Sequence, residues 1–461
     1  MASTSPESTE GTFRRAWTHS RLPFVRGKRN IARSTQLAVP YERPRGTKDY
    51  LPSECEERRA VLDRMKSVFE SYGYGEVMTP AFEHLELLVA KAGEEVVDQI
   101  YAFTDKAGRK LGLRFELTTP IARIVAENLS LPKPIRFYYI QPVWRYEEPQ
   151  RGRLREFWQA GVELIGVPGA PGDAEVLAVL INSLRRAGLS SFKVHVNDRR
   201  LVEALLHWLG VRPELISNAL RAIDKLEKKG AEYVESELAS MVSDKSRLRR
   251  FIELLGSDPL EVQLPSELPA VAMEAVDALE QLLQELEDGY GLAGLARLDL
   301  SVVRGLDYYT SLVYEAKTPL GGELGSVAGG GRYDDLIQLV GGPRIPATGM
   351  AIGVERLLET LRAEGALAPR SGRSGYYVIP VAPQFRRYAI RVAERLRAKG
   401  EKVVVEITGR KLASALEAAD RLGYKYAVVI GQREVESGAL TIRDLEAWKE
   451  EKVPLELLAG S

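Results

Sequence analysis

The segment IRFYYIQPVWRYEEPQRGRLREFWQAGVELIG, residues 135–166, decides the fold. Two apolar and aromatic stretches surround a charged loop, which predicts a long antiparallel β-hairpin. The first strand ends near Arg145, and the second carries Gln159 and Glu163. Side chains four residues apart share one face of a strand, so these two polar groups lie together. Buried polar groups need partners. The hairpin alone leaves two alternatives open, a solvated surface face or a ligand site.

Composition limits the possible classes of protein. The chain has 461 residues, enough for two to four domains, and 45% apolar and 28% charged residues are typical of a soluble globular protein. Its net charge is zero, so a nucleic-acid partner would have to be bound by local basic patches. No apolar run is long enough to span a bilayer, and we therefore expect no membrane association.

The single cysteine, Cys55, and four scattered histidines exclude a disulfide framework and predict no metal site built from Cys or His. A lone cysteine fits a reducing compartment, so we expect a cytoplasmic protein. Residues 1–40 are rich in Ser, Thr and Arg. They read as a disordered tail or a start assigned too far upstream, with a transit peptide and a basic arm as alternatives.

The order of elements predicts an α+β protein with a mainly antiparallel sheet and a separate C-terminal α/β module with a largely parallel sheet. A strand is expected to end at Pro80, and a helix to open at Pro52. The predicted divisions are an N-terminal arm, the core in two parts around a helical insertion, a linker and the C-terminal module. In chain order they are the arm (residues 1–40), the first part of the core (41–213), the helical insertion (214–291), the second part of the core (292–365), the linker (366–374) and the C-terminal module (375–461).

Two further stretches place polar residues among apolar ones. In LRFELTTP, a strand interpretation puts Glu116 and Thr118 on one face. In SVVRGLDYYTSLVYEA, residues 301–316, Tyr308 and Tyr309 would point to opposite faces of a straight strand. If both serve one pocket, the backbone must turn or bulge nearby, and Gly305 permits this. Tyrosines packing on either side of a sheet are the alternative.

Two glycine-containing stretches suggest close approach to a ligand. GSVAGGGRYDDL has three consecutive glycines, which let a backbone approach a ligand or a neighbouring strand. GMAIGVERLLETL predicts a strand, then Gly353, then a helix with Arg356 in its first turn, where a guanidinium suits a polyphosphate. The chain has no Walker motif and no convincing dinucleotide fingerprint.

Together these stretches resemble the three signatures of class II aminoacyl-tRNA synthetases. The strand ending at Pro80 is similar to motif 1, the hairpin at Arg145 to motif 2, and GMAIGVERLL to motif 3. RPRGTKDYLP, RGLDYYTSLVYE and AGGGRYDDL resemble the histidyl-tRNA synthetase family specifically. The resemblance runs from about Arg43 to the C-terminal end. It departs from the family at Glu148, where many relatives carry a basic residue, and at Trp158, where bacterial relatives often carry His.

The resemblance implies ATP-dependent ligation of histidine to its tRNA through a histidyl-adenylate, with Mg²⁺ and a homodimer formed near Pro80. Arg145, Arg304 and Arg356 would be catalytic. The residues implied to hold the substrates are Glu116, Leu117, Thr118, Arg145, Gln159, Glu163, Arg304, Tyr308 and Tyr309. Those implied to contact tRNA are Gln150, Arg151 and Arg153, with Lys402, Arg410, Lys411, Arg433 and Arg443 as a basic face of an anticodon-binding module. The alternative is a non-catalytic paralogue that regulates ATP phosphoribosyltransferase.

Overall fold

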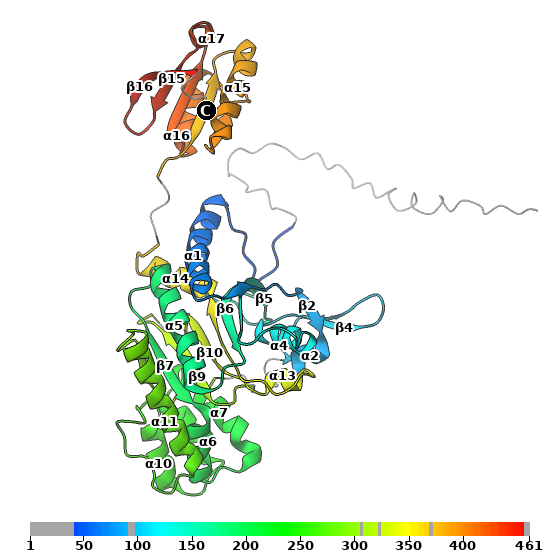
Figure 1. Ribbon diagram of the computed structural model, residues 1–461, viewed down its shortest axis with the longest axis vertical. Helices are drawn as coiled ribbons and strands as arrows, with labels where there is room; N and C mark the ends of the chain where they lie inside the picture. Colours follow the sequence, from blue (N-terminus) through cyan, green and yellow to red (C-terminus); the bar gives the residue numbers. More distant parts are fainter. Residues whose placement is uncertain (1–40, 91–96, 305–307, 321–323, 368–371, 456–461) are drawn as a thin grey trace, which may run out of the picture. The chain divides into compact units, whose positions relative to one another are not determined.

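The computed structural model describes residues 41–90, 97–304, 308–320, 324–367 and 372–455 (Figure 1). The chain divides into two compact units, Met1–Pro44 and Arg45–Ser461, and all that follows concerns the second. The predicted arm, the turn at Gly305 and part of the predicted linker lie outside the described residues. Within the described residues, no helix has the length and apolar character of a membrane span.

An eight-stranded sheet forms the body of the second unit, in the order β1-β5-β6-β11-β10-β9-β7-β8. Its strands are β1 (Gly75–Glu76), β5 (Ile135–Trp144), β6 (Glu156–Ile165), β7 (Lys193–Asp198), β8 (Ala296–Leu298), β9 (Leu312–Lys317), β10 (Ala328–Arg332) and β11 (Ala347–Gly353). Only the two outermost pairings, β1 with β5 and β7 with β8, are parallel. The prediction of a mainly antiparallel core is therefore confirmed.

The predicted hairpin is β5 and β6, paired from Ile135 opposite Ile165 to Trp144 opposite Glu156. Alternation along the strands separates two cores. Tyr138 and Val162 pack with α1 (Pro52–Ser71), α5 (Gly169–Ala187) and α14 (Val354–Ala363) on one face. Tyr139 packs on the other face with α4 (Thr118–Glu127) and α13 (Leu336–Leu339). Gln159, Gly161 and Glu163 follow the same alternation, which gives them a common face as predicted.

A small three-stranded sheet, β2-β4-β3, follows α1 and β1. Its elements are β2 (Phe82–His84), α2 (Leu85–Val89), β3 (Ala102–Thr104) and β4 (Lys110–Leu113). The predicted strand to Pro80 is wrong in extent. Regular pairing stops at Glu76, and beyond it Val77 donates its backbone N–H to Tyr138 (2.9 Å). Past this point the buried side chain of Gln141 replaces the strand pairing. It donates to the carbonyl of Val77 and accepts from the backbone N–H of Thr79.

The segment after β7 is helical. It contains α6 (Arg199–Leu209), η1 (Pro213–Leu215), α7 (Ile216–Asp224), α8 (Leu226–Lys229), α9 (Ala231–Ala239), α10 (Lys245–Leu254), α11 (Ala270–Gln284) and the π-helical η2 (Glu285–Gly289). Apolar residues of these helices form one core with Leu300 and Val303. The end of α11 and η2 instead contribute Leu282 and Leu286 to the main core. The helical segment is thus joined to the sheet at both ends.

The C-terminal module has a five-stranded sheet in the order β13-β12-β14-β15-β16. It comprises β12 (Tyr376–Pro380), η3 (Pro383–Phe385), α15 (Arg386–Ala398), β13 (Val403–Val405), α16 (Leu412–Arg421), β14 (Tyr426–Ile430), α17 (Gln432–Ser437), β15 (Ala439–Asp444) and β16 (Lys449–Pro454). The expectation of a largely parallel sheet is wrong for its second half, because β15 and β16 pair antiparallel. The edge strand β16 reads KEEKVP and lacks apolar alternation, so the sequence pattern gave no sign of it.

Candidate active site

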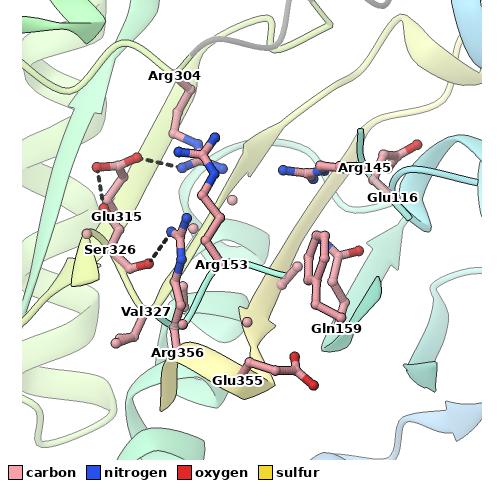
Figure 2. Close-up of a pocket in the computed structure, with 18 of the residues that line it drawn as sticks. Glu116, Arg145, Arg153, Gln159, Arg304, Glu315, Ser326, Val327, Glu355 and Arg356 are labelled. Carbon is pink, nitrogen blue, oxygen red and sulfur yellow. Dashed lines mark hydrogen bonds and ion pairs between the residues drawn. The ribbon is translucent and has the colours of Figure 1, made fainter. Parts of the chain in front are cut away.

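A cavity of about 490 Å³ opens beside strands β6, β9, β10 and β11 (Figure 2). Most of the predicted site residues line it, which brings together segments more than two hundred residues apart in the sequence. They are Glu116, Thr118, Arg145, Gln150, Arg151, Arg153, Gln159, Arg304, Tyr308, Tyr309 and Arg356. Of the residues predicted in the catalytic core, two do not line the cavity, Leu117 and Glu163. Leu117 is wholly buried in the core beside α4, and Glu163 lies beneath the cavity wall.

Arg145 enters the cavity from the end of the hairpin. Its backbone N–H bonds the carbonyl of Arg155 (2.9 Å), which extends the ladder past β5 and β6. Its Nε donates to the carbonyl of Phe115 (2.9 Å), and its guanidinium lies 5.2 Å from the ring centroid of Phe157. Burial lowers the pKa of Arg145. The remaining guanidinium N–H groups face the cavity, and the Arg145 side chain points toward Arg304 (Figure 2).

The position of the Arg304 side chain depends on an acidic partner, Glu315, and on a glycine, Gly329, that lies against its guanidinium. It donates to Glu315 (2.5 Å), whose second oxygen accepts from Ser326 (2.7 Å). Burial alone would lower the pKa of Arg304, but the Glu315 carboxylate outweighs it and raises that pKa. A Cβ at Gly329 would lie 2.7 Å from the guanidinium carbon of Arg304, so the glycine lets the guanidinium lie close against β10. Arg304 has a positive φ of 57°, which is uncommon for a residue other than glycine.

Arg356 lies in the first turn of α14, as predicted from the sequence. Its Nη1 donates to the carbonyl of Ser326 (2.9 Å). Burial, together with the nearby charges of Arg153 and Arg145, lowers the pKa of Arg356 to about 10. Several positive charges therefore lie close together at this cavity. An anion bound there would reduce their mutual repulsion.

Glu163 forms a polar floor and is fully buried. It accepts hydroxyl bonds from Thr118 (2.8 Å), Tyr139 (3.2 Å) and Tyr333. Burial raises the pKa of Glu163 to about 8 despite these bonds. A Cβ on Gly349 of β11 would lie 1.6 Å from a Glu163 oxygen, so the glycine is required for the carboxylate to lie flat there.

Tyr308 and Tyr309 both reach the cavity because they precede the strand. Regular pairing begins only at Leu312, so the predicted strand over 301–316 is wrong in its first half. The prediction that the chain must leave a straight strand is confirmed, although Gly305 itself lies outside the described residues. Their ring centroids are 4.7 Å apart, and Tyr333 lies 6.0 Å from Tyr308. These rings form an aromatic wall above Glu163.

Gln159 and Glu116 complete the polar part of the cavity (Figure 2). The Gln159 side chain is buried, and its amide oxygen has no partner among the residues that the structure describes. Glu116 accepts the backbone N–H groups of Thr118 (2.6 Å) and Thr119 (2.9 Å) at the start of α4. The predicted strand over Glu116 and Thr118 is therefore wrong, because β4 ends at Leu113 and Thr118 begins a helix. Glu116 and Thr118 nevertheless both line the cavity.

The predicted tRNA contacts lie on the turn of the hairpin. Gln150 and Arg153 exchange backbone hydrogen bonds (3.0 and 2.9 Å) across that turn. The Arg153 side chain pairs with Glu147, and Arg151 pairs with Glu359 of α14 (3.2 Å). The turn therefore faces the same cavity as the three arginines. The helical segment reaches it too, since Glu227 of α8 lines the cavity and pairs with Lys317 (2.9 Å).

Several site residues were not assigned from the sequence. Glu315, Ser326 and Gly349 fix Arg304 and Glu163, and Tyr333 bonds Glu163 directly. Glu315 and Tyr333 lie in the same stretches as the predicted Tyr309 and the three consecutive glycines. A charged residue inside the apolar strand LVYEAK was a signal for Glu315. Ser326 and Gly349 gave no such signal, because their role depends on strands paired across the sheet.

Every carboxylate that lines the cavity already has a partner. Those of Glu116, Glu147, Glu227, Glu315 and Glu355 accept from backbone N–H groups, arginines or lysine, and Asp224 also interacts within the protein. Within the described ranges, no group of three or more His, Cys, Asp or Glu residues is arranged to hold a metal ion.

Two family models match the chain, histidyl-tRNA synthetase over residues 46–357 and the anticodon binding domain over residues 376–460. A histidine–tRNA ligase of Pyrococcus furiosus is 41% identical over 421 residues, 90% of this chain and 97% of that protein. The crystal structure of histidyl-tRNA synthetase from a Nostoc species has a TM-score of 0.76 at 26% identity, covering 91% of this chain and 98% of its own. A Bacillus halodurans structure, described as an ATP phosphoribosyltransferase regulatory subunit/histidyl-tRNA synthetase, has a TM-score of 0.69 at 29% identity, over 85% and 98%.

Proposed function

The chain belongs to the histidyl-tRNA synthetase family, and on this premise we propose that its cavity joins L-histidine to ATP and then to tRNA. The observation that carries the proposal is the convergence of Arg145, Arg304 and Arg356 on one cavity that also holds an unpartnered amide. Such a cavity suits a substrate with one polyphosphate and one amino-acid end.

The first reaction is adenylation of histidine. One carboxylate oxygen of histidine attacks the α-phosphorus of ATP, the bond to the β-phosphate oxygen breaks, and pyrophosphate leaves. The carboxylate is already ionised near neutral pH, so no general base is required. The chain must align the groups and stabilise the charge that develops. Arg304 is assigned to the histidine carboxylate and α-phosphate, Arg145 to the α-phosphate, and Arg356 to the γ end of ATP.

The second task is selection of histidine. Gln159 would accept from the α-ammonium group through its unpartnered amide oxygen, beside Glu116 and Thr118. Tyr308 and Tyr309 would flank the imidazole, with the Glu163 carboxyl below it as a hydrogen-bond acceptor. Glu163 does not itself line the cavity. Its contact with imidazole would therefore pass through the hydroxyl groups bonded to it, or would require a small shift of the Glu163 side chain. A polar site of this kind rejects apolar amino acids because its buried groups would lose their partners.

Mg²⁺ would accompany ATP and offset phosphate charge, held mainly by phosphate oxygens as the engaged carboxylates imply. The protein's own contribution at that end is the set of guanidinium groups. Arg356 and Arg145 would orient the phosphates, and Arg153, which pairs with Glu147, would close the hairpin turn over them.

Transfer to tRNA is the third part of the proposal. Gln150, Arg151 and Arg153 would meet the acceptor end, whose terminal hydroxyl oxygen attacks the histidyl carbonyl and releases AMP. The C-terminal module would bind the anticodon, as its family match suggests. A homodimer formed near Pro80 and a cytoplasmic location belong to the same proposal. The exposed side chains of Met78 and Phe82 in this region are compatible with a dimer contact.

The alternative, a non-catalytic regulator of ATP phosphoribosyltransferase, is not favoured. All three arginines proposed as catalytic line the cavity, and the anticodon-binding match covers the C-terminal module. The deciding assay is charging of a tRNA transcript that carries the histidine anticodon with labelled histidine. Acid-precipitable label that requires ATP supports the proposal. A folded sample that charges no tRNA and forms no adenylate would favour the regulator.

A further inference from the structure

A buried ion pair joins α1 to the start of α14 beside the cavity. Arg58 of α1 donates from Nη1 to a carboxylate oxygen of Glu355 (2.7 Å), and the two side chains are only 9% and 7% exposed. Glu355 belongs to the cavity lining, but its carboxylate points away from the arginine cluster (Figure 2). Removing two charges from water costs much of what their attraction returns, so stability alone does not account for this pair. The proposed reaction has so far used neither residue.

Two aromatic rings fix the orientation of the Arg58 guanidinium. Its central carbon lies 4.8 Å from the ring centroid of Tyr50 and 5.0 Å from that of Trp158. Its Nη2 is buried and has no hydrogen-bond partner among the residues that the structure describes. The rings therefore hold a flat cation, which a lysine ammonium would not match. Trp158 is one of the two positions at which the sequence departs from the family pattern, and this departure belongs to the cluster.

Tyr50 reinforces the ion pair from the segment before α1. Its hydroxyl donates to the carboxylate oxygen of Glu355 that also accepts from Arg58 (3.2 Å). Burial, with the nearby charge of Glu355, raises the pKa of Tyr50 to about 12, so the hydroxyl keeps its proton near neutral pH. One oxygen of Glu355 is thus fully engaged on the side of α1.

The second oxygen of Glu355 continues the pairing between β6 and β11. The last paired residues of these strands are Gln159 and Gly353. Beyond them the chain enters α14, and Glu355 Oε2 accepts the backbone N–H of Trp158 (2.8 Å). The carboxylate therefore ties the residue before Gln159 to the residue before Arg356. Gln159 is proposed to hold the α-ammonium group of histidine, and Arg356 the γ end of ATP.

We infer that Arg58 and Glu355 are a positioning pair that holds Gln159 and Arg356 at a fixed separation for adenylation. The inference rests on the proposed joining of histidine to ATP. Neither residue of the pair has to contact a substrate, because each acts through its neighbours. A misplacement of about 1 Å can slow such a step about a hundredfold. Loss of the pair should therefore slow the reaction more than it weakens the binding of either substrate.

The same two helices supply a control. Arg362, further along α14, pairs with Glu57 of α1 (3.5 Å), and its loss also removes a guanidinium that joins these helices. The full-length variants are Arg58→Met, Arg58→Lys, Glu355→Gln, the double variant Arg58→Met with Glu355→Gln, and the control Arg362→Met. We measure kcat and the KM values for histidine and ATP in pyrophosphate exchange, together with the melting temperature of each protein.

Arg58→Met and Glu355→Gln are each expected to lower kcat by about tenfold to a hundredfold, with both KM values within about threefold of the parent. The double variant should lose no more than the worse single variant, since the two residues act as one unit. It leaves neither charge buried without its partner, so it tests the inference even if a single variant unfolds. Arg58→Lys should recover part of the loss, because it restores the charge but not the stacked plane. The control should stay within about twofold of the parent, as expected for a more exposed pair.

A double variant with the kcat of the parent would overturn the inference, and so would a loss confined to the KM values. Losses that multiply in the double variant would overturn it too, because the two residues would then act separately. An equal fall in kcat in Arg362→Met would show that any link between the helices suffices, which also contradicts the inference. Failure of the proposed function has a different signature, since the parent protein itself would then give no histidine-dependent exchange.

Discussion

The buried carboxylate of Glu163 predicts an unusual response of stability to pH. Burial raises its pKa from 4.5 to about 8, so between these values the folded chain keeps a proton that the unfolded chain has lost. The free energy of unfolding then falls by about 1.4 kcal/mol for each pH unit. Between pH 4.5 and about 8 the free energy of unfolding therefore falls by roughly 3–6 kcal/mol in total. The contribution is thus fully present below pH 4.5 and lost as the pH rises through about 8.

Glu163→Gln removes this titration with little change in shape, which matters because Gly349 lies directly against the side chain. At pH 4 the parent protein and the variant should differ least in stability, because the Glu163 side chain is then mostly neutral in both the folded and the unfolded chain. At pH 9 the variant should be more stable. In a domain of this size the difference amounts to roughly 10 °C in the melting temperature of the core.

Differential scanning calorimetry is the suitable assay because it separates the transition of the core from that of the C-terminal module. Comparing the two proteins at each pH cancels the titration of all other groups. Tyr333→Phe provides a second test, since loss of one hydroxyl donor should raise the carboxylate pKa further and move the fall in stability to higher pH. A difference between parent and Glu163→Gln that stays constant from pH 5 to 9 would refute the reasoning.

The remaining predictions concern activity and assembly. Arg304→Ala should abolish pyrophosphate exchange while leaving the circular dichroism unchanged, and near-normal exchange would remove Arg304 from the reaction. Glu163→Ala should weaken histidine binding by tenfold or more, about 1.4 kcal/mol, with ATP binding unaffected; an effect confined to ATP would contradict its role. Truncation after Gly372 should spare exchange but impair charging, and unimpaired charging would leave the C-terminal module without its proposed task. Light scattering should give the mass of a dimer, and a monomeric mass would contradict the contact near Pro80.

The sequence predicted the hairpin and its polar face well, because strand alternation is a local property. The positions of Gln159, Glu163 and Arg356 followed from spacing alone. The depth of Glu163 did not, since it depends on Gly349 in a strand almost two hundred residues away. Long-range pairing of this kind leaves no periodic signal in a single sequence.

The errors have local physical causes. The residue pattern predicts a strand at Glu116, but its carboxylate accepts the first backbone N–H groups of α4, so a helix begins there. The strand β16 was missed because an exposed edge strand needs no apolar residues. The charge pattern groups the predicted basic residues of the C-terminal module on one face. The sheet topology instead places Arg410, Lys411 and Arg433 beyond the carboxyl ends of the parallel strands, and Lys402 and Arg443 near their amino ends.

The central claim is that the cavity activates histidine and no other amino acid. The most direct measurement is ATP–pyrophosphate exchange with each of the twenty amino acids in turn, with Mg²⁺ present. Exchange is expected with histidine alone. Exchange with a different amino acid, or no exchange from a folded sample, would contradict it.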